Sequence, residues 1–243
     1  MKVSIIIAVY NSHEAVRRQL LYFKNMQLPG DVELVVVDDG SIPPLDGATI
    51  RTGFNLAWTQ GLARNIGCAN SAGEYLLFTD IDHILSRAAI EDVRNFTGDR
   101  MMFHRYFGVL TEEGQLTQDM DILYEYGLKV PVLARRGLYA SVHLNTFAIK
   151  RSTFVGLEGY DARHSSYGYH PVTKQGDDCA FNKKWNNYAR DNGLQLAMGS
   201  DIYMFPVGRY HRNGETNPMG LFHDLSYDGQ TARIKGDECR TSA

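Results

Sequence analysis

The sequence predicts an α/β fold with a mostly parallel central sheet flanked by helices, and three observations support this. Apolar runs that suit strands buried on both faces alternate with amphipathic helical patterns through the first third of the chain. A β-α-β-α-β order implies parallel strands joined by right-handed crossovers. Acidic clusters follow the second and third strands, at the sheet edge where ligands of such folds bind.

The first strand and helix are marked by a change of pattern. Residues 3–9 form a continuous apolar, β-branched run, as expected for a buried strand. Asn11 and Glu14 then form a capping-box pattern. A stripe at helical spacing follows: Val16, Leu20 and Phe23. We expect Pro29-Gly30 to end this helix.

The next elements repeat this alternation. Residues 33–37 form a second apolar strand, and residues 75–78 form a third. Between them, a helical stripe is closed by Gly73; its members are Leu62, Ile66 and Ala69. These elements make residues 1–96 one half of a single domain.

The second half, residues 97–226, is less regular. Just before this half, Ser86 is expected to cap a helix that carries Ile90 and Val93. We expect strands at residues 101–107 and 144–149, and a polar loop at residues 111–121. A last helix, ended by Asn192-Gly193, carries an apolar stripe: Phe181, Trp185 and Tyr188. Residues 227–243 form a polar C-terminal tail.

Composition narrows the class of protein. The 243 residues suffice for one sizeable core, and a net charge of −3 argues against broad capture of nucleic acid. The three cysteines have no metal-type spacing, which favours free thiols in a reducing compartment. No apolar run is long enough to span a bilayer. We therefore expect a cytoplasmic protein that reaches a membrane only through partners.

Two acidic clusters could carry chemistry. Asp80 and Asp82 follow a buried strand and point to the same side of an extended segment, where a divalent cation would relieve their repulsion. Asp39, after the second strand, could accept hydrogen bonds from a nucleoside. Arg64, near a helix start, could clamp a phosphate or pair with Asp39. Each feature alone is also typical of a surface turn or an ordinary helix face.

The four motifs together are more specific. In order and spacing they resemble family 2 glycosyltransferases of the GT-A fold: residues 3–11, 37–41, 61–67 and 72–82. The resemblance returns at residues 147–151, 159–161 and 176–178. It implies a Rossmann-like sheet with a smaller acceptor-side region. Residues 97–143 match no pattern of the family.

The resemblance also implies site residues. The donor nucleotide would contact Ala8, Tyr10, Asp39, Arg64, Asp80 and Ile81, with Asp39 reading the base, which is uracil in most relatives. Asp80 and Asp82 would bind Mn²⁺ or Mg²⁺, with His211 as a third ligand. His83 and His143 have no ligand spacing, and we expect them to be ordinary hydrogen-bonded histidines.

The implied reaction is a single inverting displacement on a nucleotide sugar, UDP-linked in most relatives. Asp177-Asp178 would supply the base that takes the acceptor proton. We assign the base to Asp178, because it shares a helix face with Phe181 and Trp185 and should turn inward. Asp177 would then cap the helix or contact the acceptor. Within an insertion at residues 163–170, Tyr167 and Tyr169 would contact the acceptor, and residues 203–218 would close over the donor.

Other functions stay open at this stage. One is a sugar-nucleotide or glycan-binding module without turnover, which a turnover assay would distinguish. Another is a nucleotidyltransferase of similar fold, which would carry a glycine-rich basic loop where residues 8–12 stand here. The acceptor could be a glycan, a lipid-linked saccharide or another hydroxyl compound, and the charge makes a nucleic-acid acceptor the least favoured.

Overall fold

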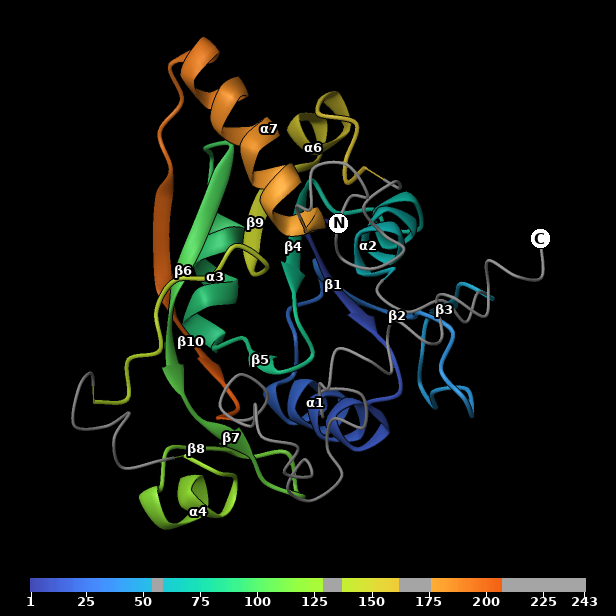
Figure 1. The fold of residues 1–243 in the computed structure, drawn as a ribbon, viewed down its shortest axis with the longest axis vertical. Helices are drawn as coiled ribbons and strands as arrows, with labels where there is room; N and C mark the ends of the chain where they lie inside the picture. Colours follow the sequence, from blue (N-terminus) through green and yellow to red (C-terminus); the bar gives the residue numbers. More distant parts are fainter. Residues whose placement is uncertain (54–58, 129–136, 162–175, 207–243) are drawn as a thin grey trace.

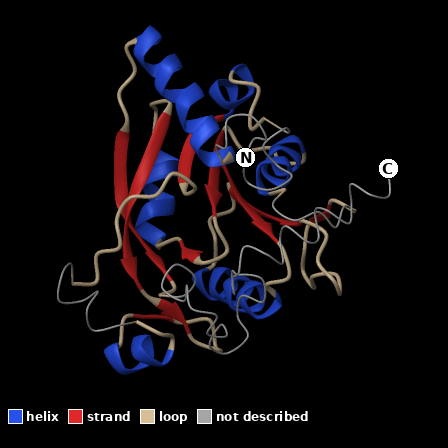
Figure 2. Ribbon diagram, viewed as in Figure 1, coloured by secondary structure: helices blue, strands red, loops and turns tan. Residues whose placement is uncertain are grey.

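The structure is a computed structural model that describes residues 1–53, 59–128, 137–161 and 176–206. Its centre is an eight-stranded sheet of order β3-β2-β1-β4-β9-β6-β10-β5, flanked by helices on both faces (Figures 1 and 2). The strands are β1 (Val3–Val9), β2 (Val32–Asp38), β3 (Ile50–Arg51), β4 (Tyr75–Thr79), β5 (His83–Ile84), β6 (Arg100–Phe107), β9 (Phe147–Lys150) and β10 (Ala197–Met204).

Strand direction brings several carboxyl ends to one edge of the sheet. β1 pairs in parallel with both β2 and β4, as the alternating pattern predicts. β9 is antiparallel to β4 and to β6, so β4 and β6 run in the same direction. β10 is parallel to β6. The chain therefore leaves β1, β2, β4 and β6 at the edge where α/β folds bind ligands.

The two faces of the sheet are buried against different helices. All seven residues of β1 are buried, and alternate ones enter two separate cores. One core packs under α1 (His13–Met26) and α3 (Arg87–Asn95). The other packs under α2 (Gln60–Ala69), α6 (Arg151–Gly156) and α7 (Asp177–Asn192). A hairpin and a short helix lie beyond β6: β7 (Val109–Leu110), β8 (Leu116–Thr117) and α4 (Met120–Glu125).

The capping box predicted at Asn11 and Glu14 is wrong. The helix N-cap is Ser12, with no side-chain cap bond. Asn11 has a φ of 49° and its side chain accepts a hydrogen bond from the backbone N–H of Ile42. Glu14 instead pairs with Arg17 and Arg18. Both side chains have partners from tertiary or helix-face contacts, which compete with the local cap.

Other predicted boundaries differ as well. α1 ends at Met26, before Pro29-Gly30, because Gln27 takes a left-handed conformation and its N–H closes the last turn. Gly73 does not close α2, which ends at Ala69. It is needed for close approach to β1, since a Cβ at Gly73 would lie 2.4 Å from the backbone nitrogen of Ser4.

In the second half, Ser86 caps α3 as predicted by accepting a hydrogen bond from the N–H of Ala89. β9 begins only at Phe147, three positions later than expected at residue 144. The expected loop at residues 111–121 contains β8 and the start of α4. Among the described helices, none is long and apolar enough to cross a membrane.

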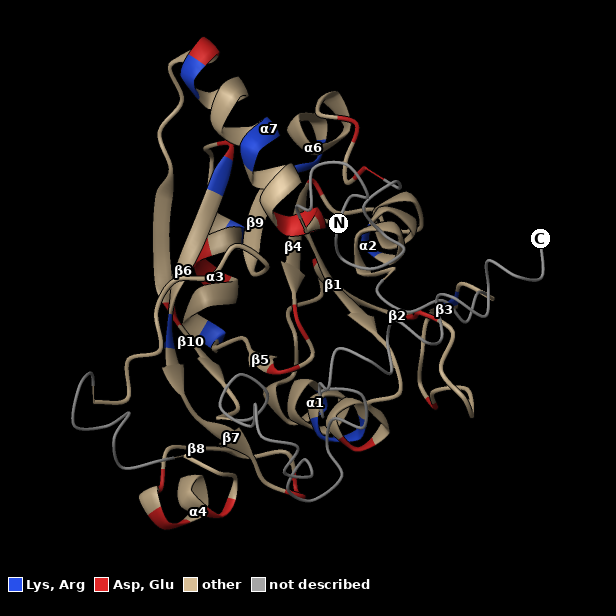
Figure 3. Cartoon of the chain, viewed as in Figure 1, with Lys and Arg blue, Asp and Glu red and all other residues tan. Residues whose placement is uncertain are grey.

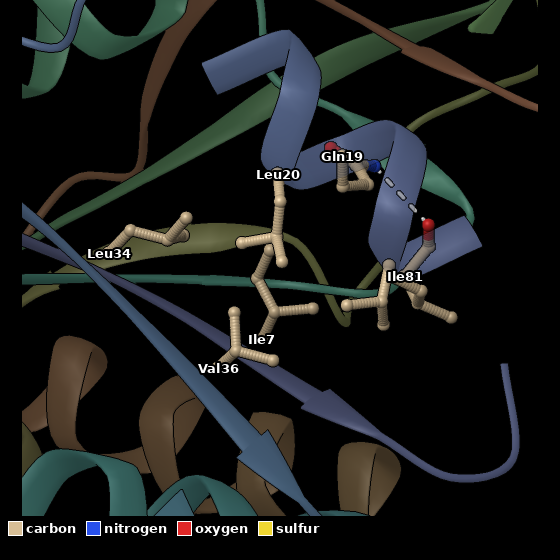
Figure 4. A pocket seen from close by; sticks show the side chains of 7 residues that line it. Ile7, Gln19, Leu20, Leu34, Val36 and Ile81 are labelled. Carbon is tan, nitrogen blue, oxygen red and sulfur yellow. Dashed lines mark hydrogen bonds between the residues drawn. The ribbon is translucent and has the colours of Figure 1, made fainter. Parts of the chain in front are cut away.

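A small apolar gap lies between α1 and the sheet (Figure 4). The lining residues are Ile7, Val16, Gln19, Leu20, Leu34, Val36 and Ile81. The side chain of Gln19 donates a hydrogen bond to the backbone carbonyl of Ile81. This lining has few polar groups to orient a ligand, so we treat the gap as imperfect packing under α1.

Candidate active site

Two adjacent carboxylates after β2 have different surroundings. Asp38 accepts hydrogen bonds from the backbone N–H groups of Ser41 and Leu45, at 2.8 and 3.1 Å, so it holds the following turn together. Asp39 is 5% exposed. Burial raises the pKa of Asp39 to about 7, and the negative charges of Asp38 and Asp177 add to the rise. Of these two carboxylates, Asp38 is thus the one that holds the turn after β2.

Arg64 lies buried in α2 and ties two other elements to it. Its guanidinium donates to Asp80 Oδ1 at 2.5 Å and to the hydroxyl of Tyr160 at 2.8 Å. The predicted pairing of Arg64 with Asp39 is wrong, because Arg64 pairs with Asp80. Burial works against the charge of Arg64, but Tyr160, Asp80 and Asp177 outweigh it and raise its pKa.

Asp80 is the most heavily bonded acid of the site. Besides Arg64, the side-chain amide of Gln60 donates to its Oδ1 at 2.5 Å. Burial alone would raise the pKa of Asp80, but Arg64 and the nearby His83 and His143 lower it to about 2. Asp80 is therefore ionised across the physiological range.

Asp80 and Asp82 lie in a turn that is closed by a hydrogen bond from the His83 N–H to the Asp80 carbonyl, and not in the predicted extended segment. Asp80 Oδ2 is 3.9 Å from His83 Nδ1, and Asp82 Oδ1 is 3.9 Å from His83 Nε2. The two carboxylates therefore approach one imidazole ring from its two nitrogens. A cation held by both acids would lie next to His83.

His83 is already engaged at both nitrogens. Its Nδ1 lies 2.5 Å from the hydroxyl of Thr146, and its Nε2 lies 2.6 Å from the guanidinium of Arg105. Because Arg105 can only donate, Nε2 accepts and Nδ1 carries the proton. Burial lowers the pKa of His83 well below its usual value, so the ring is neutral. As predicted, His83 is a hydrogen-bonded core histidine.

His143 is a site residue that sequence spacing missed. One ligand atom each from Asp80, His83 and His143 lie within 4.8 Å of one another. The His143 ring packs edge-on to His83, with centroids 5.8 Å apart. His143 precedes β9, far along the chain from Asp80, so only the pairing of β9 with β4 brings it here.

At the start of α7, Asp177 is more buried than Asp178, the opposite of the prediction. Asp177 is 8% exposed, whereas Asp178 is only half-buried and accepts from the N–H of Cys179. The prediction that Asp178 turns inward is therefore wrong. The first turn of α7 lies against α2 at Gly61, where a Cβ would come within 2.7 Å of Asp177 Oδ2. The glycine leaves room for the Asp177 carboxylate.

Three acids therefore surround the first turn of α2: Asp39, Asp80 and Asp177. Burial raises the pKa of Asp177, while Arg64 and the backbone N–H of Gly61 favour its ionised form. Acidic segments after β4 and at the start of α7 mark this region in Figure 3. Acids with raised and lowered pKa values around one buried arginine are typical of a functional site.

One family model matches the first part of the chain. The sequence model described as Glycosyl transferase family 2 matches residues 4–100. The likeness to this family is therefore shown for residues 4–100, which are fewer than half of the 243 residues. This region includes three of the four motifs that we identified, and most of the first one. No curated protein sequence matches the chain.

Solved structures show that the fold is that of the GT-A glycosyltransferases. S. aureus TarS has a TM-score of 0.53 at 18% identity, over 86% of this chain and 37% of TarS. TarS residues 1–349 in complex with UDP have a TM-score of 0.52 at 17% identity, over 84% of this chain and 60% of that one. The chain thus spans between about one third and two thirds of the length of these neighbours.

The other predicted site residues have varied positions. Ala8 is buried near the end of β1, and Tyr10 is half-buried just after it. The side chain of Ile81 lines the apolar gap under α1 (Figure 4). Tyr167, Tyr169 and His211 lie outside the described residues. So do the tail at 227–243 and all of the predicted closing segment beyond residue 206.

Asp39 should make stability depend on pH. Its pKa is about 7 in the folded chain against an ordinary 3.8, so its contribution is complete below about pH 4 and is lost as the pH rises through 7. Asp39→Asn removes this titration. We expect the Tm of this variant to exceed that of the parent at pH 8. Each kcal/mol of difference in the free energy of unfolding should shift the Tm by about 2–4 °C.

Thermal unfolding of the two proteins between pH 4 and pH 8 measures this difference. The gap in Tm should shrink as the pH is lowered toward 4, where both side chains are neutral. Asp46→Asn, at an exposed acid, is the matched control. A constant gap across the pH range would mean that Asp39 does not titrate as its burial indicates.

Proposed function

We propose that this chain transfers a sugar from a UDP-linked donor to an acceptor hydroxyl, with inversion at the anomeric carbon and with help from a divalent metal. The observation that carries this proposal is the convergence of three acids on the start of α2: Asp39 and Asp80, which follow parallel strands, and Asp177, which begins α7. The family of residues 4–100 supports glycosyl transfer. The UDP complex of TarS residues 1–349 supports UDP as the nucleotide to test first.

The donor set fits a divalent metal. Asp80 offers a carboxylate oxygen and His143 an imidazole nitrogen in one cluster with His83, a mixture that suits Mn²⁺ or Mg²⁺. Asp82, whose Oδ1 lies 3.9 Å from His83 Nε2, stays a predicted further acid. His83 is a poor ligand because Arg105 occupies its Nε2. A bound cation would neutralise charge that develops on the departing diphosphate. His211 stays a predicted further ligand.

Each remaining residue has a proposed task. Asp39 accepts a hydrogen bond from the base, best when it is ionised, so nucleotide binding should favour loss of its proton. Arg64 keeps Asp80 ionised and in place. The backbone after β1, at Tyr10, lines the nucleoside side of the site.

Asp177 is the proposed base, and Asp178 is its less buried neighbour. A base that takes the acceptor proton must be ionised before the reaction and must hold a proton after it. Burial raises the pKa of Asp177, and Arg64 with the Gly61 N–H limits that rise. This combination suits proton transfer near neutral pH. The proton passes from the acceptor hydroxyl to Asp177 as the new glycosidic bond forms and the bond to the diphosphate breaks.

Metal and nucleotide together should stabilise the chain more than either does alone. We expect UDP with Mn²⁺ to raise the Tm more than either alone, since ligand at 100 times its Kd adds about 2.7 kcal/mol of stability. Excess chelator should remove this gain and stop UDP release from UDP-sugars. Asp82→Asn should weaken the combined effect, while the exposed control Asp201→Asn should retain it.

The measurement is a thermal-shift titration with UDP and UDP-sugars, with and without Mn²⁺, followed by an assay for UDP release. UDP release at full rate in excess chelator would remove the metal from the mechanism. Binding of UDP-sugar without any turnover, across a panel of acceptors, would favour a binding module.

A further inference from the structure

A group of three partly exposed aromatic side chains lies beyond the acids, and we call it the aromatic corner: His104, Tyr106 and Tyr139. The Tyr106 and Tyr139 rings are nearly perpendicular, with centroids 5.4 Å apart. The His104 and Tyr139 rings are 5.9 Å apart, and His104 Nδ1 lies 3.3 Å from the Tyr139 hydroxyl. Unlike the core aromatic residues, all three retain contact with solvent.

Backbone pairing holds the aromatic corner rigid. The segment around Tyr139 runs antiparallel to β6, with a bridge between Tyr106 and Tyr139. Hydrogen bonds of 2.8 Å on either side join Phe107 to Leu138 and Ala140 to Arg105. Rings on a paired backbone lose little further freedom when a ligand binds, which favours affinity.

The aromatic corner shares a face of the sheet with α7. Residues 102, 104 and 106 of β6 point to one side, because side chains alternate along a strand. Met102 packs in the same core as Phe181 and Trp185 of α7. The corner therefore continues the face that α7 covers, toward the carboxyl end of β6, and Asp177 is the first residue of that helix.

The same chain segment joins the aromatic corner to the acids. Two residues after Tyr139, the backbone carbonyl of Ser141 accepts a hydrogen bond of 2.9 Å from Arg105, whose guanidinium also contacts His83. Two residues later His143 lies beside His83 and Asp80. The corner is thus linked to the candidate metal ligands through a short, hydrogen-bonded stretch of chain.

We propose that the aromatic corner is an acceptor subsite and that the acceptor is a saccharide; this rests on the proposed glycosyl transfer. A sugar ring has apolar C–H faces that pack on aromatic rings and hydroxyl edges that bond to polar tips. Tyr and His present both an apolar body and a polar tip. The corner also lies outside residues 4–100, in the part of the chain where acceptor preference is free to differ from the family.

The test measures sugar binding directly. Methyl glycosides of glucose, galactose, mannose and N-acetylglucosamine are titrated by saturation-transfer NMR, with and without UDP and Mn²⁺. A serine-containing peptide serves as the non-sugar acceptor. We expect at least one glycoside to bind, and Tyr106→Ala and Tyr139→Ala each to weaken it about tenfold, since aromatic contacts contribute on the order of 1 kcal/mol.

Two matched variants separate packing from folding. Tyr139→Phe keeps the ring and should retain most of the binding, while Tyr124→Ala, at a 40%-exposed tyrosine on α4, should leave it unchanged. Equal sugar binding by the parent and both corner alanine variants would overturn the proposal, as would binding of the peptide in place of every glycoside. If the parent protein binds a glycoside but not UDP, the proposed UDP-linked donor would be rejected. The proposed sugar subsite at the aromatic corner would still be supported.

Discussion

Asp177→Asn is expected to reduce sugar transfer by a factor on the order of 10²–10⁴, the usual contribution of a positioned general base. The variant keeps a side-chain oxygen that can still accept from the backbone N–H of Gly61, so α7 should dock on α2 as before. UDP binding should be unchanged, because the proposed donor contacts are made by other residues. Initial rates of UDP release with and without acceptor, together with the UDP affinity, measure the separate effects.

Asp178→Asn is the matched control for this prediction, one residue along the same helix. Its carboxylate is half-buried and bonds only locally to the N–H of Cys179. We expect this variant to lose much less activity than Asp177→Asn. A larger loss in Asp178→Asn, with both proteins folded and binding UDP, would transfer the role of base to Asp178 and show that burial misidentified it.

Arg64→Met is expected to lower the free energy of unfolding by about 3–5 kcal/mol, the cost of removing one partner of a buried ion pair. Arg64 is 1% exposed and Asp80 is 14% exposed, so water replaces little of the lost interaction. The substitution leaves the Asp80 carboxylate with the side chains of Gln60 and Asn145 as donors and removes the bond to the Tyr160 hydroxyl. Denaturant unfolding measures the change.

A double-mutant cycle isolates the pair. Asp80→Asn in the Arg64→Met background removes the uncompensated charge, so the double variant should be more stable than Arg64→Met alone. Arg17→Met, at an exposed arginine that pairs with Glu14 on α1, is the control and should cost less than about 1 kcal/mol. Additive effects of the Arg64 and Asp80 substitutions would show that the two side chains do not stabilise each other.

Much of the fold was predictable because its signals are local. Residues 3–9 are apolar at almost every position, a pattern that suits a strand covered on both faces, and β1 is such a strand. Ser86 caps α3 and Gly193 ends α7 because these tasks depend on one side chain or one backbone conformation. The capping box at Asn11 failed because Ile42, distant in sequence, supplies a competing donor.

The candidate site was predictable in outline but not in its pairings. Parallel strand order alone brings the acids after β2 and β4 to one edge, so Asp39 and Asp80 could be assigned to a site from the sequence. His143 could not, because no spacing rule links it to Asp80 before β9 is paired with β4. The partner of Arg64 was equally undetermined, since Asp39 and Asp80 follow the two strands that pair with β1 on either side.

By itself the sequence determined the order of strands and helices, the family of residues 4–100 and the acidic edge of the sheet. Only the tertiary structure decided which carboxylates are buried and which cation each one meets. Helical periodicity leaves Asp177 and Asp178 on either side of the same stripe, and the docking of α7 against Gly61 selects Asp177. Burial depends on what packs against a residue, and that information is distributed over segments far apart in the chain.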